Sequence, residues 1–220
     1  MDNRKFWNER YNSLPSLGSG PGSRAYAAWI KRRLIADYVA ARGVRSILDL
    51  GCGDMYWMAE VPIGGVTYTG VDISDVIVDR NRARLPQFEF LLHDFAAAPL
   101  DRSADLVLCF DVLIHQLAPE QFRATLRNIL ASVGSVALIS YLTANASAGS
   151  PLPETPHDIR QDEDALLQFL HSAAFPRAET AFHGDLALEI GQLMPHADVR
   201  IVGSYPYQTI YEVTLAKPRD

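Results

Sequence analysis

Two acidic residues and two glycines stand where predicted strands would deliver them to one edge of a sheet. The apolar strand predicted at 44–50 carries Asp49 one residue before its end and leads directly into Gly51 and Gly53, and Asp72 follows the next apolar run. Glycines let the backbone turn sharply and approach a ligand. In open α/β sheets the ligand crevice lies at the carboxyl ends of the strands, where an acidic residue can accept hydrogen bonds from both hydroxyls of a ribose. These residues therefore predict a nucleoside-containing ligand.

Two kinds of nucleoside cofactor would use such residues. The dinucleotide fingerprint G-x-G-x-x-G needs a third glycine, and this chain has Tyr56 at that position. Asp54 also places a negative charge where a pyrophosphate would bind. S-adenosylmethionine (SAM) has no phosphate and carries a positive sulfonium and a positive ammonium, so an acidic loop suits it. The residues favour SAM, and NAD(P) remains the alternative.

Two histidines are candidates for a general base. His115 lies four residues after Asp111, and His157 lies in the segment 143–160, which holds three prolines. An unperturbed imidazole has a pKa near ~6.5, so either histidine is suited to take a proton from an oxygen nucleophile. The alternative for each is an ordinary hydrogen bond to the backbone. The histidines show no metal-ligand spacing with the cysteines, so we expect no metal site.

Predicted strands and helices alternate along most of the chain. Strands are predicted at 44–50, 66–71, 88–92, 106–110, 133–141, 198–203 and 210–215, and helices at 24–42, 56–60, 74–84, 119–131 and 162–173. This alternation predicts a Rossmann-like, doubly wound α/β sheet of seven strands. The last two strands are separated by a short turn and must pair antiparallel, because a parallel crossover is much longer. The sheet should therefore be mostly parallel, with one antiparallel strand in the C-terminal hairpin.

We expect a single domain over 1–220. It divides into a helical N-terminal cap (1–43), a SAM-binding core (44–141), a substrate or lid region (142–195) and a closing strand pair (196–220). Residues 1–24 and 143–160 are expected to cover the site, because neither shows the periodicity of a buried core.

Charge and composition exclude several classes of partner. The formal net charge is −6, which argues against a nucleic-acid partner. Lys31, Arg32 and Arg33 form one basic run, which we expect on a solvated helix face. No apolar run reaches membrane-spanning length, and the first thirteen residues hold no apolar region of the kind a signal peptide needs, so we expect neither a membrane span nor a signal peptide. The two cysteines, Cys52 and Cys109, are expected to be packing residues in a reducing, cytoplasmic setting.

The motifs resemble those of the class I SAM-dependent methyltransferases. ILDLGCGD at 47–54 is similar to their first motif and YTGVDIS at 68–74 to their second. LLHDF at 91–95 matches the position near the adenine, and ADLVLCFDVLIHQL at 104–117 is similar to the fourth-strand motif. Many members have another glycine where this chain has Met55. The head, FWNERY followed by GSGPGS, resembles a group of stand-alone bacterial methyltransferases.

The resemblance implies a role for each motif residue. Asp49 would hold the SAM ammonium, Asp72 the ribose hydroxyls and Asp94 the adenine amine, while Asp111 and Val112 would line the methyl side. The residues expected to bind the cofactor are Asp49, Gly51, Cys52, Gly53, Asp72, Ile73, His93, Asp94, Phe95, Asp111 and Val112. For Asp49 the alternative is capping of the following helix, and for Asp94 it is a turn.

The sequence thus predicts transfer of a methyl group from SAM to a small-molecule acceptor. A hydroxyl, on a sugar or a secondary metabolite, is the expected acceptor group. Methyl transfer from a sulfonium is a direct displacement that depends mainly on alignment, so no catalytic triad is required. Two other functions stay open: an NAD(P)-dependent oxidoreductase, and a non-catalytic SAM-fold module that binds a partner protein.

Overall fold

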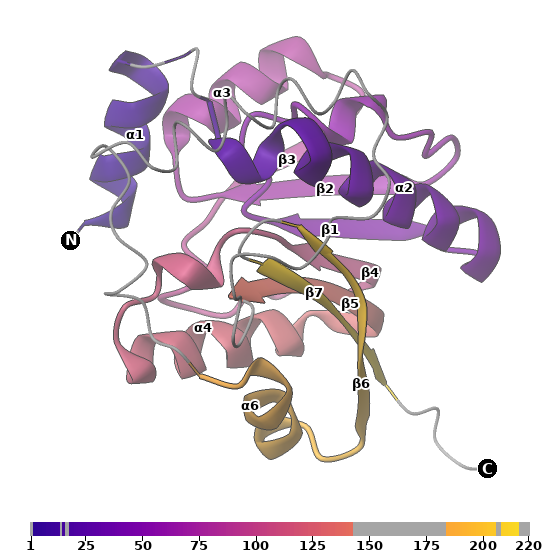
Figure 1. Ribbon diagram of the computed structural model, residues 1–220. Helices are drawn as coiled ribbons and strands as arrows, with labels where there is room; N and C mark the ends of the chain where they lie inside the picture. Colours follow the sequence, from indigo (N-terminus) through magenta and orange to yellow (C-terminus); the bar gives the residue numbers. More distant parts are fainter. Residues whose placement is uncertain (1, 14, 16–17, 143–183, 206–207, 216–220) are drawn as a thin grey trace.

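A seven-stranded sheet with the order β3-β2-β1-β4-β5-β7-β6 forms the centre of the computed structural model, which describes residues 2–13, 15, 18–142, 184–205 and 208–215 (Figure 1). Its strands are β1 Ser46–Leu50, β2 Thr67–Asp72, β3 Glu89–Leu92, β4 Ala104–Cys109, β5 Val133–Leu142, β6 Ala197–Tyr205 and β7 Gln208–Leu215. Strands β1 to β5 pair in parallel, and β7 is antiparallel to both β5 and β6. The predicted fold class, with one antiparallel strand in the closing hairpin, is confirmed.

The helices begin and end largely where local signals predict. They are α1 Asn3–Ser13, α2 Ala25–Arg42, α3 Asp75–Arg84, α4 Pro119–Ala131 and α6 Leu186–Leu193. Gly43 ends α2 in the left-handed conformation (φ 61°), and the Ser74 hydroxyl caps α3 by accepting from the N–H of Ile77. The helix predicted at 56–60 is only a 3-10 turn over Met58–Glu60, and α6 was not predicted from the sequence. The helix predicted at 162–173 lies outside the described residues.

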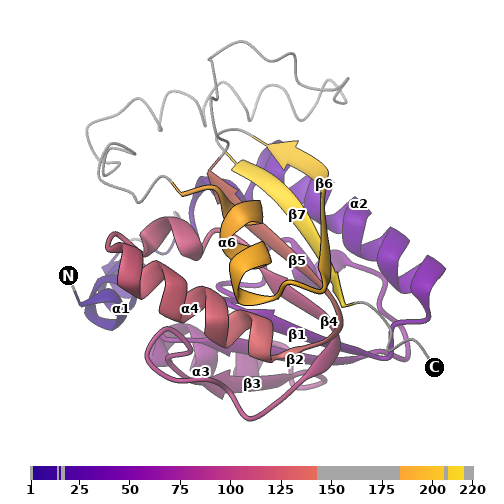
Figure 2. The ribbon, with the colours of Figure 1, turned by 90° about the horizontal axis from the view of Figure 1, so that it is seen from below.

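The helices form layers on both faces of the sheet (Figures 1 and 2). Alternate strand residues face opposite sides, so Leu106 and Leu108 pack toward α2 while Val107 and Cys109 pack toward α4 and α6. Strand β4 is buried on both faces, which explains its continuous apolar sequence. Both cysteines are buried, free thiols, as expected of packing residues.

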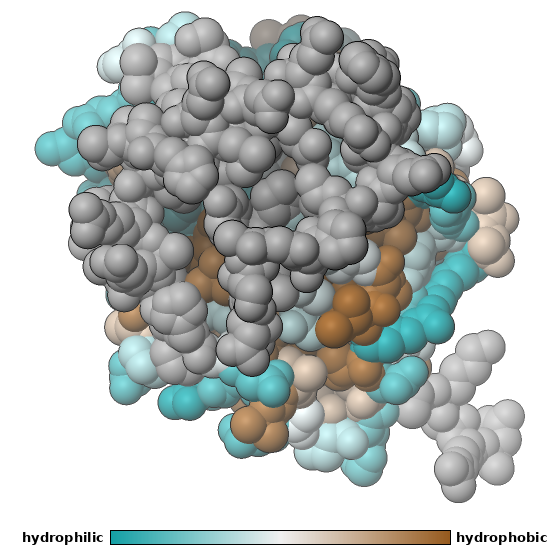
Figure 3. All heavy atoms as spheres, in the orientation of Figure 1, coloured by the Kyte–Doolittle hydropathy of each residue, from teal (hydrophilic) through white to brown (hydrophobic). Residues whose placement is uncertain are grey.

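The surface mixes hydrophilic and hydrophobic residues, and in Figure 3 hydrophobic atoms gather in the lower half of the face, next to the grey atoms. The large hydrophobic side chains that are exposed come from separate segments: Tyr56, Leu92, Leu117, Leu188 and Ile201. Within the described part of the chain, no helix has both the length and the apolar character needed to cross a membrane.

The order of the strands fixes where a ligand crevice can lie. After β1 the chain moves outward through β2 to β3, and it then returns to place β4 on the other side of β1. The connections on either side of β1 therefore diverge at its carboxyl end. Such a switch point is the usual position of a ligand crevice in an open α/β sheet.

Candidate active site

One pocket lies at this switch point, where the strands β1, β2, β3 and β4 end. All eleven residues predicted to bind the cofactor line it, and so does His115: Asp49, Gly51, Cys52, Gly53, Asp72, Ile73, His93, Asp94, Phe95, Asp111 and Val112. The fold therefore brings together residues that are up to 66 positions apart in the sequence (49 to 115). His157 lies outside the described residues.

Asp72 is a buried carboxylate that orders the loops around it. Its Oδ2 accepts from the N–H of Gly53 at 3.0 Å, and its Oδ1 accepts from the N–H of Ser74 at 2.9 Å. Burial raises the pKa of Asp72 to about 6, although the backbone N–H groups oppose this shift. Each oxygen retains a second acceptor site, so the carboxylate is suited to bind a diol.

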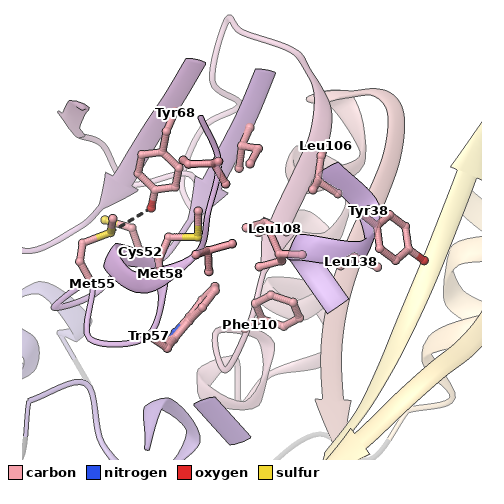
Figure 4. Close-up of a cluster of buried hydrophobic side chains, with 14 of the residues drawn as sticks. Tyr38, Cys52, Met55, Trp57, Met58, Tyr68, Leu106, Leu108, Phe110 and Leu138 are labelled. Carbon is pink, nitrogen blue, oxygen red and sulfur yellow. Dashed lines mark hydrogen bonds between the residues drawn. The ribbon is translucent and has the colours of Figure 1, made fainter. Parts of the chain in front are cut away.

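Asp49 lies deeper, near the end of β1. Its Oδ2 accepts from the Tyr68 hydroxyl at 2.7 Å, and burial raises its pKa to about 7. Figure 4 shows Tyr68 among the buried side chains near Cys52 and Met55, and its hydroxyl also contacts the sulfur of Met55. Asp49 caps no helix, because the next helical residue is Met58. A buried carboxylate with a raised pKa gains from a nearby cation.

The glycine loop passes close to its neighbours. Gly51 has φ 87°, and a Cβ there would lie 2.3 Å from Cγ2 of Val112. The loop approaches the end of β4 so closely that only glycine fits without a shift. Tyr56, at the third position of the dinucleotide fingerprint, is 48% exposed and stacks with Arg24, whose guanidinium carbon is 4.0 Å from the ring centroid.

Asp54 does not act as the sequence suggested. Its Oδ2 is 2.5 Å from the guanidinium of Arg24 and accepts from the N–H of Ser19 at 3.1 Å. Among the described residues that line the pocket, Asp54 is absent. The negative charge expected to repel a pyrophosphate is therefore paired outside the pocket. Tyr56 does not line the pocket either, and the loop is followed by a 3-10 turn over Met58–Glu60 in place of a longer helix.

The segment after β3 supplies the expected adenine residues. Asp94 is exposed, and its Oδ1 accepts from the N–H groups of Ala96 and Ala97, at 3.1 and 3.2 Å. It therefore makes the turn that was its alternative role, and its Oδ2 has no hydrogen bond among the described residues. Phe95 is buried behind it, and His93 contacts the carbonyl of Ala98.

The N-terminal cap contributes to the pocket. Residues Asn3, Trp7, Tyr11, Ser19 and Ser23 line it. Helix α1 lies beside α3 (Figure 1), and Arg80 of α3 donates to the carbonyl of Tyr11 at 2.8 Å. We call residues 18–23 the strap: Ser19 accepts from the N–H of Asp54 at 2.8 Å, which joins the strap to the glycine loop. Residues 1–24 were expected to cover the site, and these five residues agree with that expectation, although none of them was named as a site residue. The i,i+4 spacing of Trp7 and Tyr11 indicates that they share a helix face.

His115 ends a 3-10 turn after β4 and packs edge-on against Trp7, with ring centroids 5.2 Å apart. Burial lowers the pKa of His115 to about 4, against the raising effect of Asp111. The imidazole is therefore neutral near pH 7 and able to accept a proton. The lowered pKa also makes it a weaker base than an exposed histidine.

The burial of Lys31 contradicts an expectation from the sequence. The run from Lys31 to Arg33 was expected on a solvated helix face, but the Lys31 side chain is fully buried and forms an ion pair with Asp111. Arg33 is exposed and follows the expectation. Helix α2 turns Lys31 toward the sheet because it is one turn before the buried Ile35.

Comparisons with known proteins agree with this geometry. Residues 47–134 match the model of a methyltransferase domain family. The chain is 29% identical over 184 residues to a Mycolicibacterium smegmatis protein named probable S-adenosylmethionine-dependent methyltransferase, covering 79% of this chain and 70% of that protein. A Mycobacterium tuberculosis protein of the same description is 28% identical over 165 residues, covering 71% of this chain but only 59% of its own length.

A solved structure shows the same fold at low sequence identity. Magnesium protoporphyrin IX methyltransferase from Synechocystis, with bound SAH, has a TM-score of 0.63 and 18% identity, and the match covers 97% of this chain and 98% of that chain.

Proposed function

We propose that the chain is a class I SAM-dependent methyltransferase that transfers the methyl group of SAM to a hydroxyl oxygen of a small molecule, such as a sugar or a secondary metabolite. One observation carries the proposal. The residues of four separate sequence motifs line a single pocket, and one end of this pocket holds the neutral imidazole of His115 within electrostatic reach of Asp111.

The donor set fits SAM. Asp49 and Asp72 are buried carboxylates whose pKa values are raised by burial, so a cationic ligand with a diol would satisfy both. When bound, SAM supplies an electrophilic methyl group on a sulfonium sulfur. In our proposal Asp49 binds the ammonium, Asp72 binds the ribose hydroxyls, and Ile73 and Phe95 flank the adenine.

The other end of the pocket suits an uncharged oxygen nucleophile. A neutral imidazole can accept the proton of a hydroxyl as the new bond from oxygen to carbon forms. The rings of Trp7 and Phe110 line the same pocket and would exclude water around the reacting atoms. We propose that His115 aligns the hydroxyl and receives its proton.

A nicotinamide-dependent oxidoreductase receives no support. The first strand is followed by a 3-10 turn rather than by a helix whose N-terminus could bind a pyrophosphate. A non-catalytic role is also disfavoured, because the carboxylates of Asp49, Asp72 and Asp111 and the imidazole of His115 belong to residues that line the same pocket.

The test is a methyl-transfer assay with SAM labelled on its methyl group. The purified protein is incubated with panels of alcohols and sugars, phenols, amines and carboxylic acids. We expect label only in compounds with hydroxyl groups. Transfer to amines alone would overturn the hydroxyl assignment, and a failure to bind SAM would overturn the function as a whole.

With an acceptor in hand, His115→Ala should lower the rate at saturating SAM by about 100-fold, the lower end of the usual range for a general base, because burial makes the imidazole a weak base. His196, a histidine that does not line the pocket, provides the matched control His196→Ala. An unchanged rate in His115→Ala would show that alignment and exclusion of water suffice.

A further inference from the structure

Behind the acceptor end of the pocket lies a buried ammonium group. The side chain of Lys31 has no exposed surface, and its Nζ donates to the carboxylate of Asp111 and, at 2.5 Å, to the carbonyl of Gly22. A buried charge is costly unless it is paired and hydrogen-bonded. A lysine in this position therefore indicates a requirement for positive charge next to Asp111.

Three aromatic rings surround this ammonium. Nζ of Lys31 lies 4.8 Å from the ring centroid of Tyr205, 5.0 Å from that of Phe110 and 5.7 Å from that of Trp57. These distances are within the range of cation–π contacts. Figure 4 shows Trp57 and Phe110 side by side, and both also line the pocket. The ammonium thus lies one layer of side chains behind the pocket wall.

The partners of Asp111 are all donors. Its Oδ1 accepts from the Tyr205 hydroxyl at 2.8 Å and from the amide of Gln208. The orientation of that amide is fixed, because its Oε1 accepts from the Ser140 hydroxyl at 2.8 Å. Ser140 in turn accepts from the N–H of Asp111 at 2.8 Å. The network is therefore built around an ionised carboxylate.

Asp111 nevertheless still reaches the pocket. Its side chain is 18% exposed and lines the pocket, and its backbone adopts the left-handed conformation (φ 61°) that is uncommon for residues other than glycine. A Cβ on Gly22 would lie 2.4 Å from Oδ1 of Asp111, so the backbone of the strap lies very close to this carboxylate. The carboxylate is held in place with its charge already matched.

We propose that Lys31 is a specificity-determining residue, which neutralises Asp111 from behind and so makes the acceptor end of the pocket receptive to a neutral hydroxyl and unfavourable to a cationic amine. This inference rests on the proposed methyltransferase function. A hydroxyl can donate to the remaining acceptor site of Asp111. An ammonium would find a carboxylate that is already paired, and it would lie near the charge of Lys31.

The test uses ligands that differ in charge at the position of the transferred methyl group. S-adenosylhomocysteine (SAH) is neutral there, and sinefungin carries a protonated amine in place of the sulfonium methyl. In Lys31→Met the carboxylate of Asp111 loses its counter-ion. We expect sinefungin to bind about tenfold more tightly relative to SAH than it does to the wild type, measured by calorimetry at one pH near neutrality.

Two further variants test the inference without relying on Lys31→Met. Lys31→Arg keeps the charge and should keep the wild-type ratio of affinities. Asp111→Asn leaves Lys31 without its counter-ion, so sinefungin should weaken by about tenfold relative to SAH. If Lys31→Met fails to fold, judged by loss of SAH binding, the Asp111→Asn ratio decides. A ratio that stays within about twofold of the wild type in every variant that binds SAH overturns the inference.

Failure of the proposed function would look different. If the wild type binds neither SAM nor SAH, the assignment of the site falls and the inference falls with it. If the acceptor screen yields only amines, the site accepts the group that Lys31 should disfavour, and both the hydroxyl assignment and this inference are overturned while the methyltransferase function stands.

Discussion

The carboxylate of Asp72 serves both the loops and the pocket. We expect Asp72→Asn to weaken SAM binding by about tenfold or more, because hydrogen bonds to a charged acceptor contribute ~1.5–3 kcal/mol each. Asp72→Ala should weaken it further, since the N–H groups of Gly53 and Ser74 also lose their acceptor. Calorimetric titration with SAM measures both effects.

A second aspartate offers a matched control. Asp105 also accepts from two backbone N–H groups, those of Arg45 and Ser46, but it does not line the pocket. Asp105→Asn should therefore leave SAM affinity unchanged. Equal losses in the Asp72 and Asp105 variants would mean that Asp72 supports the fold and does not bind the ligand.

The strap is the part of the N-terminal cap that contacts both the glycine loop and the carboxylate of Asp111. Ser19 contacts the glycine loop, and Gly22 contacts Lys31 and abuts Asp111. In Gly22→Ala the new methyl group would lie within 2.6 Å of all three atoms of the Asp111 carboxylate. We expect a loss of about 1–3 kcal/mol in the free energy of unfolding, the usual cost of overpacking, together with weaker SAM binding.

The chain provides a control for that substitution as well. A Cβ on Gly64 would meet nothing within 4 Å, and Gly64 does not have a positive φ. Gly64→Ala should therefore leave both the unfolding curve and SAM affinity unchanged. If Gly22→Ala behaves like Gly64→Ala, the strap can move away from Asp111 without a loss of stability or of SAM affinity.

Elements set by local sequence could be predicted, whereas those set by distant contacts could not. Gly43 ends a helix through its backbone conformation, and Ser74 begins one through its side-chain hydroxyl.

The burial of Lys31 depends on Asp111, 80 residues away, and nothing in the run of three basic residues distinguishes the first from the third. Asp54 was misjudged for the same reason, since its partner Arg24 comes from another element. Helix α6 has only eight residues, about two turns, which is too short for its apolar residues to establish a helical period.

The candidate site was predictable to the extent that it follows from strand ends. The glycine loop, Asp72 and Asp111 each lie at or just after the end of a strand. Because ligands in open α/β sheets bind at the carboxyl ends of the strands, this position alone assigns all three to one site. The residues that the cap contributes, such as Trp7 and Ser19, could not be found in this way, because their position depends on how α1 packs beside α3.

Over the whole molecule, burial of acidic groups in the pocket links ligand binding to pH. Burial raises the pKa of Asp49 to about 7 and that of Asp72 to about 6, so the free protein binds protons there that an unfolded chain would release. These two groups therefore destabilise the free protein increasingly as pH rises from about 4 through these pKa values. His115 acts in the opposite direction, since its lowered pKa costs stability as pH falls from about 6.5 to about 4.

Bound SAM should oppose the loss of stability that Asp49 and Asp72 cause as the pH rises. A cationic ligand favours the ionised carboxylates, so we expect its affinity to increase from about pH 5 to about pH 8, with protons released on binding. Calorimetry in two buffers of different ionisation enthalpy counts those protons. A constant affinity with no proton release would mean that Asp49 and Asp72 are already ionised in the free protein.

The hairpin of β6 and β7 has a consequence for when the enzyme becomes competent. Tyr205 and Gln208 hold Asp111 from 94 and 97 residues further along the chain, and β7 inserts between β5 and β6. During synthesis the glycine loop and both cofactor carboxylates emerge long before these two residues. On the proposed function, a nascent chain would carry the part of the pocket assigned to SAM before the two partners of Asp111 are synthesised, so we expect no methyl transfer until β7 has paired with β5 and β6.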